Sequence, residues 1–204
     1  MPFKAKNIET GENIYITSYV KPKIELMHTQ LVCPYCESDM IVKGGIGRKV
    51  ISHFCHKTTC TANIDYKPGG QGESVNHQIS KKYIYGQLTE QNKASIEAGE
   101  HRYEYEYSVK DNDVWRIADI AEILSDGTFA TAYEIQLSYI QLEELERRTN
   151  DYTRLGAETV WIFGGSANTT ENRDWCIDNI GIYGVVKIGT KDVTSTRALK
   201  SVSI

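Results

Sequence analysis

The order of secondary structure after residue 74 is the feature that most constrains the fold of this chain. Residues 102–109, RYEYEYSV, alternate strictly between polar and apolar side chains, which indicates a half-buried strand. Asp126-Gly127 indicates a hairpin turn between the two strands that follow. The predicted elements are a helix over 74–88, strands over 102–109, 114–124 and 129–138, a helix over 139–155, and strands over 159–163 and 182–188. Three antiparallel strands followed by a crossover helix and another strand predict a mixed α/β sheet with helices on both faces.

Residues 66–73, YKPGGQGE, form the clearest break in the chain, because glycine and proline interrupt regular structure. We therefore predict two domains, a β-rich module over 1–68 and an α/β domain over 69–204. Residues 1–30 favour short strands around a turn at Gly11. With 40% hydrophobic residues, the chain can form one ordinary core and a small appendage.

The formal charge of −4 does not by itself indicate a nucleic-acid-binding protein, but the charges are unevenly distributed. Residues 1–60 carry a formal +3, so the rest of the chain carries −7. An acidic domain that acts on a polyanion would need cations, which carboxylates can bind. The first residues, MPFKAKNIETGENIYI, lack the apolar run of a secretion signal, and no apolar run could cross a bilayer. We therefore expect a soluble, cytoplasmic protein without membrane contacts.

Four of the five cysteines fall between residues 33 and 60. In a chain without a secretion signal, such a cluster is typical of metal ligands rather than disulfides. Cys33 and Cys36, in CPYC, can hold one zinc ion from a tight turn. Since four protein ligands close a zinc site, we expect a structural ion that folds the module.

The second pair of zinc ligands must come from residues 52–60, SHFCHKTTC. Cys55 and Cys60 would complete a Cys₄ set with a spacing close to that of a zinc ribbon. His56 is an alternative to Cys55 because both lie near the same turn, and His53 is a second alternative. His53 and Cys55 are expected on one strand face and His56 on the other.

Two carboxylates fall on neighbouring predicted strands, Asp119 on the second and Glu134 on the third. The hairpin brings these strands together, and Glu134 and Gln136 share one face because side chains alternate along a strand. Carboxylates directed at one point favour a bound cation, and their hard oxygen ligands suit Mg²⁺ or Mn²⁺. Such an ion can activate water and neutralise charge on a scissile phosphate, while Gln136 could orient water or contact the phosphate.

Glu73, His77 and Lys81 recur at intervals of four, so they share one face if the helix begins at Glu73. An exposed series of charged residues is the commoner explanation of this spacing. Arg148 and Tyr152, on the second helix, would by themselves be ordinary surface residues. An aspartate followed by Glu-x-Gln is also common, and becomes informative only in combination with the predicted order of elements.

Several blocks, in order, resemble the competence protein CoiA family of predicted nucleases. They are Thr10-Gly11-Glu12, the CPxC of residues 33–36, His53-Phe54 with His56, Glu73-Ser74 with His77 and Lys81, Arg116-Ile-Ala-Asp119, Glu134-Ile-Gln136-Leu-Ser138, Arg148-Thr149 with Tyr152, and TVWIF at 159–163. The Glu-x-Gln-x-Ser block with the Arg-Thr pair and tyrosine behind it is the most specific part. Cys55, inside the HF-x-H block, departs from the family pattern.

The family is similar to PD-(D/E)xK nucleases, with glutamine in the lysine position. The resemblance therefore implies a restriction-endonuclease-like αβββαβ core behind a β-rich, zinc-ribbon-like module, and a role in handling DNA. The catalytic residues that it implies are Asp119, Glu134, Gln136 and Glu73, with Mg²⁺ or Mn²⁺ held by Asp119 and Glu134. Substrate contacts are expected from His77, Lys81, Arg148 and Tyr152.

The expected function is Mg²⁺-dependent hydrolysis of phosphodiester bonds in double- or single-stranded DNA. The zinc module would grip the backbone without reading sequence. The alternative is a non-catalytic DNA-binding or adaptor protein that retains the fold, which the glutamine at position 136 supports. The clustered acids argue for the enzyme, since a decayed site has no reason to keep costly charges. A homodimer is compatible with either reading, because nucleases of this plan often pair to cut both strands.

Overall fold

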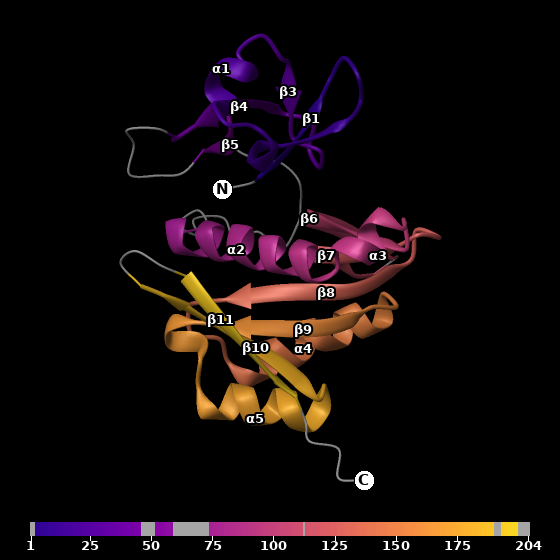
Figure 1. Cartoon of the computed structure of the whole chain (residues 1–204), viewed down its shortest axis with the longest axis vertical. Coiled ribbons are helices and arrows are strands. Elements are labelled where there is room, and N and C mark those ends of the chain that lie inside the picture. Colours follow the sequence, from indigo (N-terminus) through magenta and orange to yellow (C-terminus); the bar gives the residue numbers. More distant parts are fainter. Residues whose placement is uncertain (1–2, 46–51, 59–73, 112, 190–192, 200–204) are drawn as a thin grey trace. The chain divides into compact units, whose positions relative to one another are not determined.

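The computed structural model of the chain describes residues 3–45, 52–58, 74–111, 113–189 and 193–199 (Figure 1). The chain divides into two compact units, Met1–Gln78 and Ile79–Ile204. The described residues form two open sheets together with helices, which confirms the mixed α/β class. None of the described helices combines the length and the apolar character that a bilayer crossing requires.

The N-terminal unit contains a sheet of short strands in the order β2-β1-β3-β4-β5, and each neighbouring pair is antiparallel. The strands are β1 (Lys4–Asn7), β2 (Asn13–Tyr15), β3 (Leu31–Val32), β4 (Asp39–Lys43) and β5 (His53–His56). A 3-10 turn, η1 (Ile16–Ser18), and helix α1 (Pro22–Glu25) connect β2 to β3. The turn predicted at Gly11 is confirmed, and its φ of +74° is a conformation that glycine adopts readily.

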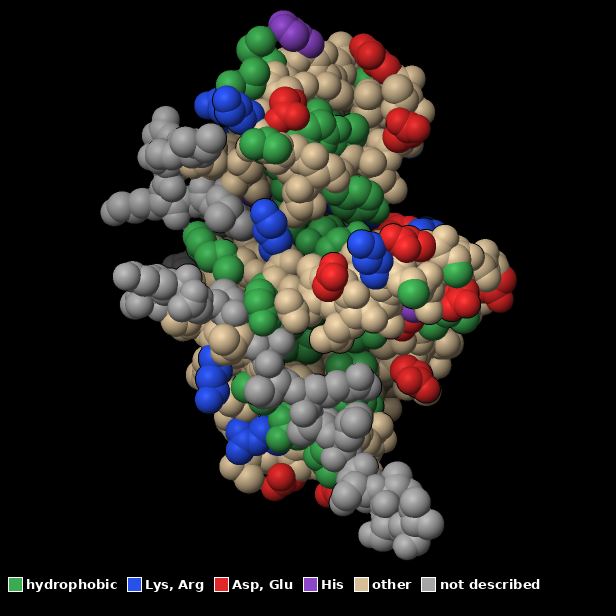
Figure 2. All heavy atoms as spheres, in the orientation of Figure 1, with side chains coloured by type: hydrophobic (Ala, Val, Ile, Leu, Met, Phe, Trp, Pro, Cys, Tyr) green, Lys and Arg blue, Asp and Glu red, His purple; other side chains and the backbone are tan. Residues whose placement is uncertain are grey.

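Large hydrophobic side chains reach the surface of the N-terminal unit, as Figure 2 shows. Ile8 and Met27 are 56% and 65% exposed, and together with Ile41 they line a pocket bordered by α1, β3 and β4. Phe3 and Phe54 are the largest fully buried side chains among the residues of this unit that the structure describes. A module with so small a core is of the kind that a metal ion commonly stabilises.

The C-terminal unit contains a mixed sheet in the order β11-β10-β9-β8-β7-β6. The strands are β6 (His101–Lys110), β7 (Trp115–Leu124), β8 (Phe129–Gln136), β9 (Glu158–Phe163), β10 (Ile182–Ile188) and β11 (Val193–Leu199). β6, β7 and β8 form the predicted antiparallel meander, β9 pairs parallel to both β8 and β10, and β11 returns antiparallel. The parallel pairing of β8 and β9 follows from the helix that crosses between them.

Helices cover both faces of this sheet. α2 (Val75–Gln91), whose residues from Ile79 onward belong to this unit, lies in front of β6 and β7 in Figure 1. α4 (Leu142–Arg154) lies behind β9 and carries the residues that face the candidate site. Both helices were predicted from the sequence, and they begin and end within a few residues of the predicted positions.

Among the described residues of the C-terminal unit, α3 (Lys93–Glu97), α5 (Thr170–Asn179) and β11 were not predicted. α5 begins after Thr169, whose hydroxyl accepts a hydrogen bond from the backbone N–H of Asn172 at 3.2 Å. Its sequence lacks a clear apolar stripe, and Thr169 is of a residue type that could have signalled the start of a helix. α5 follows η2 (Gly165–Ala167) and buries Cys176, whose thiol has its pKa raised to about 12 by burial.

Two hydrophobic clusters lie beneath α4 and fix its position on the sheet. One consists mainly of alanine and aromatic residues, together with Ile123, around Tyr152: Ala118, Ala121, Ile123, Phe129, Ala132 and Ala157. The other gathers around Trp161: Ile140, Leu145, Phe163, Ala167 and Cys176. Alanine at four positions of the first cluster allows the helix to approach the strands closely. Tyr152 and Trp161 are therefore rigid supports on which polar side chains of the site can rest.

The alternation of β6 reverses in the middle of the strand. Tyr105 stacks on Tyr85 of α2 with ring centroids 4.1 Å apart, whereas Tyr107 packs with Phe129 in the cluster beneath α4. In a regular strand, positions 105 and 107 would face the same side. Glu106, between them, has a φ of +48°. The strand predicted over 102–109 is confirmed, but its strict alternation ends at Glu106.

Candidate active site

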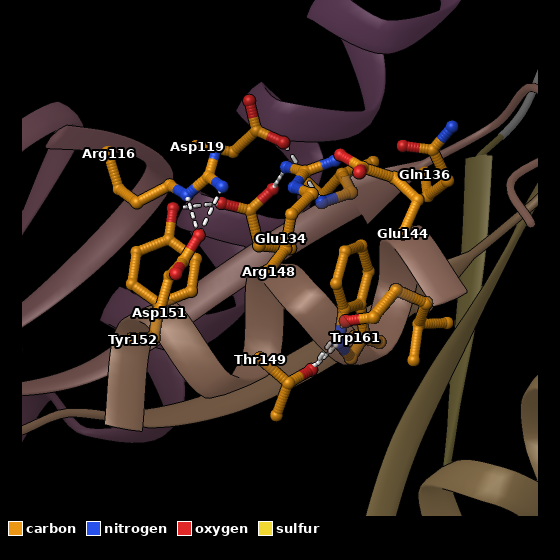
Figure 3. A network of polar contacts seen from close by, with 12 residues as sticks. Arg116, Asp119, Glu134, Gln136, Glu144, Arg148, Thr149, Asp151, Tyr152 and Trp161 are labelled. Carbon is orange, nitrogen blue, oxygen red and sulfur yellow. Dashed lines mark hydrogen bonds and ion pairs between the residues drawn. The ribbon is translucent and has the colours of Figure 1, made fainter. Parts of the chain in front are cut away.

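Asp119 of β7 and Glu134 of β8 lie beside each other in the C-terminal unit. The antiparallel register pairs Ile120 with Tyr133, so the two acidic residues occupy the next positions on their strands. Oδ2 of Asp119 accepts a hydrogen bond from the backbone N–H of Ile135 at 2.9 Å. Figure 3 shows both carboxyl groups close to the guanidinium of Arg148. The structure thus brings together the two carboxylates that the sequence placed on neighbouring strands.

Glu134 is held by two side chains of α4. Its carboxylate accepts hydrogen bonds from Arg148 at Oε2 and from the Tyr152 hydroxyl at Oε1, and the Glu134 side chain is only 2% exposed. The Arg148 guanidinium lies over the ring of Trp161, 5.0 Å from its centroid, which is a cation–π contact. The Trp161 indole in turn donates to Thr149 at 2.9 Å. This network ties Glu134 of β8 to α4 and, through Arg148 and Trp161, to β9 (Figure 3).

Asp119 and Glu134 both influence the pKa values of Tyr152 and Arg148. Burial raises the pKa of Tyr152 well above its ordinary value, and the negative charges of Glu134 and Asp119 raise it further. Burial alone would lower the pKa of Arg148, but attraction to the negative charges of Glu134 and Asp119 raises it overall. The phenol therefore stays protonated and the guanidinium stays charged, so both remain donors.

Lys81 of α2 lies against carboxylates rather than at the surface. Its ammonium is 2.8 Å from Oε1 of Glu106 and 3.8 Å from Oδ1 of Asp119, and its side chain is only 3% exposed. A substrate contact by Lys81 stays a prediction, since its ammonium is directed at two acids in this arrangement. The sequence did not single out Glu106, because Glu104 occupies an equivalent polar position two residues earlier.

The remaining residues predicted for this site are Gln136, His77 and Glu73. Gln136 donates from its side-chain amide to the backbone carbonyl of Ser138 at 2.7 Å, and that amide points away from the two carboxylates in Figure 3. His77 lies in the first turn of α2, where its backbone N–H donates to the Ser74 hydroxyl at 3.2 Å. Glu73 lies outside the described residues, so its catalytic role stays a prediction.

In the N-terminal unit, Cys33, Cys36 and His56 form a group that could hold a metal ion. Their ligand atoms all lie within 4.8 Å of one another, and Sγ of Cys36 is 3.4 Å from Nε2 of His56. The backbone N–H of Tyr35 donates to Sγ of Cys33 at 3.4 Å, an interaction that suits a thiolate. Two thiols and an imidazole are the donor set that zinc prefers.

Among the alternative ligands, the structure brings His56 to the two cysteines and leaves Cys55 out of the described group. The Cys55 thiol instead donates to the backbone carbonyl of His56 at 3.4 Å. His53, at the start of β5, is also outside this group, and Cys60 is not among the described residues. Burial raises the pKa of the Cys33 thiol to about 12, an effect that a bound cation would offset by pairing with the thiolate.

The fold and the site together define a mixed α/β domain with two acidic residues side by side on adjacent strands. Residues 73–180, more than half of the chain, match the family model described as competence protein CoiA, nuclease-like domain. The chain therefore belongs to this family, and the resemblance seen in its sequence motifs is confirmed. No curated protein matches the chain significantly, and no solved structure does so either.

Proposed function

We propose that the protein is a metal-dependent nuclease that hydrolyses phosphodiester bonds in double- or single-stranded DNA. The observation that carries this proposal is the meeting of Asp119 and Glu134 on adjacent strands, next to the charged side chains of Lys81 and Arg148. Membership of a nuclease-like family supports the same reading. Acids gathered in this way are costly unless cations, including a bound divalent ion, balance them.

Asp119 and Glu134 would hold Mg²⁺ or Mn²⁺, because carboxylate oxygens are the ligands these ions prefer. The bound ion would supply a water of lowered pKa and offset charge on the scissile phosphate. Arg148 is 22% exposed at its side chain, so its guanidinium can pair with a phosphate that approaches from solvent. Gln136, at the end of β8, would contact the phosphate or orient water.

The N-terminal module, proposed to cover residues 1–68, would hold a structural zinc ion with Cys33, Cys36 and His56. Cys60 would be the fourth ligand. The basic excess of residues 1–60 would help the module to grip the DNA backbone independently of sequence. A homodimer would allow two sites to act on opposite strands.

A second candidate function, a non-catalytic DNA-binding protein, is favoured by one observation. Both oxygens of Glu134 already accept hydrogen bonds, from Arg148 and from Tyr152. A divalent ion would have to share this carboxylate with two donors, which lowers its affinity for the site. Calorimetric titration of Mn²⁺ distinguishes the two functions, because the binding protein needs no metal affinity in this unit.

The decisive experiment measures cleavage of supercoiled plasmid and of single-stranded DNA with Mg²⁺, with Mn²⁺ and with EDTA. We expect cleavage with either metal and none with EDTA. Asp119→Asn and Glu134→Gln should each lower the rate by about 10³-fold, since metal-ion catalysis contributes several kcal/mol. Glu146→Gln, an exposed carboxylate on α4, is the matched control and should cleave normally. Full activity in either site variant, or a metal-binding protein that never cuts DNA, would overturn the proposal.

A further inference from the structure

Glu106 has a backbone conformation that strands do not normally contain. Its φ of +48° lies in the left-handed region, which residues other than glycine seldom adopt. Tyr105 pairs with Ile120 and Tyr107 pairs with Ala118, so Glu106 lies in register with Asp119. Irregular residues of this kind re-aim side chains next to functional sites. Here the irregularity accompanies a glutamate side chain that is buried beside Asp119.

The Lys81 ammonium lies near the carboxylates of both Glu106 and Asp119, and it is closer to Glu106. The ammonium is at hydrogen-bonding distance from Glu106, 2.8 Å, but 3.8 Å from Oδ1 of Asp119. The Lys81 and Glu106 side chains are 3% and 10% exposed, so both charges are largely removed from water. A buried ammonium must keep a carboxylate partner, because leaving it unpaired is strongly unfavourable.

We propose that Glu106 is a positioning residue for the site formed by Asp119 and Glu134. It holds the Lys81 ammonium closer to its own carboxylate than to Oδ1 of Asp119, so that Lys81 competes less strongly with a divalent cation at that oxygen. Oδ2 already accepts the hydrogen bond from Ile135, so Oδ1 is the oxygen for which Lys81 and the cation compete. This inference rests on the proposed metal-dependent function.

Removing the charge of Glu106 should change the partner of Lys81. In Glu106→Gln the carboxylate 2.8 Å from the buried ammonium becomes a neutral amide, so the remaining attraction of Asp119 should draw Lys81 closer to Oδ1. The divalent cation then has to displace an ammonium from Oδ1. Its affinity falls, although neither Asp119 nor Glu134 has been altered. Removing Lys81 together with the charge of Glu106 should relieve this competition.

Calorimetric titration of Mn²⁺ into the full chain tests the proposal. We expect Glu106→Gln to weaken Mn²⁺ binding about tenfold or more. Raising the Mn²⁺ concentration should restore its DNA cleavage. The double variant Glu106→Gln with Lys81→Met should recover most of the lost affinity. Glu104→Gln is the matched control on the same strand, because its carboxylate pairs with Arg102 instead, and it should bind Mn²⁺ as the unaltered chain does.

The outcomes separate this inference from the function on which it rests. If the unaltered chain neither binds Mn²⁺ nor cuts DNA, the proposed function fails. If it does both while Glu106→Gln binds Mn²⁺ equally well, only the positioning role fails. A double variant that binds as weakly as Glu106→Gln would show a general structural effect and would also overturn that role. Should Glu106→Gln not fold, the double variant, which contains no unpaired buried charge at 81 or 106, decides the question by its Mn²⁺ affinity.

Discussion

The backbone N–H of Ile135 donates a hydrogen bond to the carboxylate of Asp119 at 2.9 Å. This bond ties a side chain of β7 to the strand that carries Glu134. It orients Oδ2 of Asp119 through a contact within the protein, without a bound ion. The relative position of the two acids therefore depends on the pairing of β7 with β8 and on this bond.

Asp119→Asn retains an oxygen that can accept this hydrogen bond, whereas Asp119→Ala does not. We expect Asp119→Ala to lower the free energy of unfolding by about 1 kcal/mol more than Asp119→Asn, because the N–H of Ile135 loses its acceptor. Urea denaturation of both variants measures the difference. Equal stabilities would contradict a structural role for this bond.

Arg148 neutralises a carboxylate that is almost completely buried. Arg148→Met should lower the free energy of unfolding by about 3 kcal/mol, because Glu134 would be left charged and without its cation. The double variant Arg148→Met with Glu134→Gln should recover much of this loss. Arg147→Met, which removes the neighbouring half-exposed arginine, is the control and should change stability by less than the site variant. If Arg148→Met is no less stable than Arg147→Met, the pairing contributes nothing.

The raised pKa of Tyr152 predicts a loss of stability in alkaline solution. The folded protein keeps the phenolic proton above the pH at which the unfolded chain releases it, about 10. The free energy of unfolding should therefore fall as the pH rises above about 10, by up to about 1.4 kcal/mol per pH unit for this group. Tyr152→Phe should show a shallower fall, whereas Tyr139→Phe, at a 62% exposed position, should follow the unaltered chain. Denaturation at several pH values measures this; identical slopes for both variants would count against the effect.

The described metal group predicts which residues are needed for zinc. Cys36→Ser and His56→Ala should each lose bound zinc, and the N-terminal unit should then become susceptible to proteolysis. Cys55→Ser should retain zinc, because its thiol lies outside the group. Elemental analysis of the purified variants gives the zinc content directly. Loss of zinc from Cys55→Ser together with its retention in His56→Ala would establish the other ligand set.

Local signals predicted the parts of the fold that have local causes. Asp126-Gly127 specified the hairpin between β7 and β8, and Gly127 adopts a φ of +88°. The amphipathic pattern around Leu145 and Tyr152 specified α4, and both side chains are buried. β11 and α5 were not predicted. β11 lacks a regular alternation of apolar residues, and α5 lacks an apolar stripe at helical spacing. Their positions depend on packing and pairing with distant segments, which a short stretch of sequence does not contain.

The candidate site was predictable to the same extent. The hairpin register was enough to place Asp119 near Glu134, because it depends on a single turn. The partners of these acids depend on tertiary packing. Lys81 reaches Asp119 from α2, and Arg148 reaches Glu134 from α4, the helix that connects β8 to β9. Glu106 could not be distinguished from Glu104, because its left-handed backbone has no signature in an alternating segment.

At position 106, the backbone conformation and the ion pair with Lys81 favour different residue types. The backbone there would be relaxed by glycine, which adopts a positive φ without steric cost. The ammonium of Lys81 requires a carboxylate, which glycine cannot supply. A glycine at this position would therefore relax the backbone and lose the charge together, whereas glutamate keeps both the charge and the strained conformation.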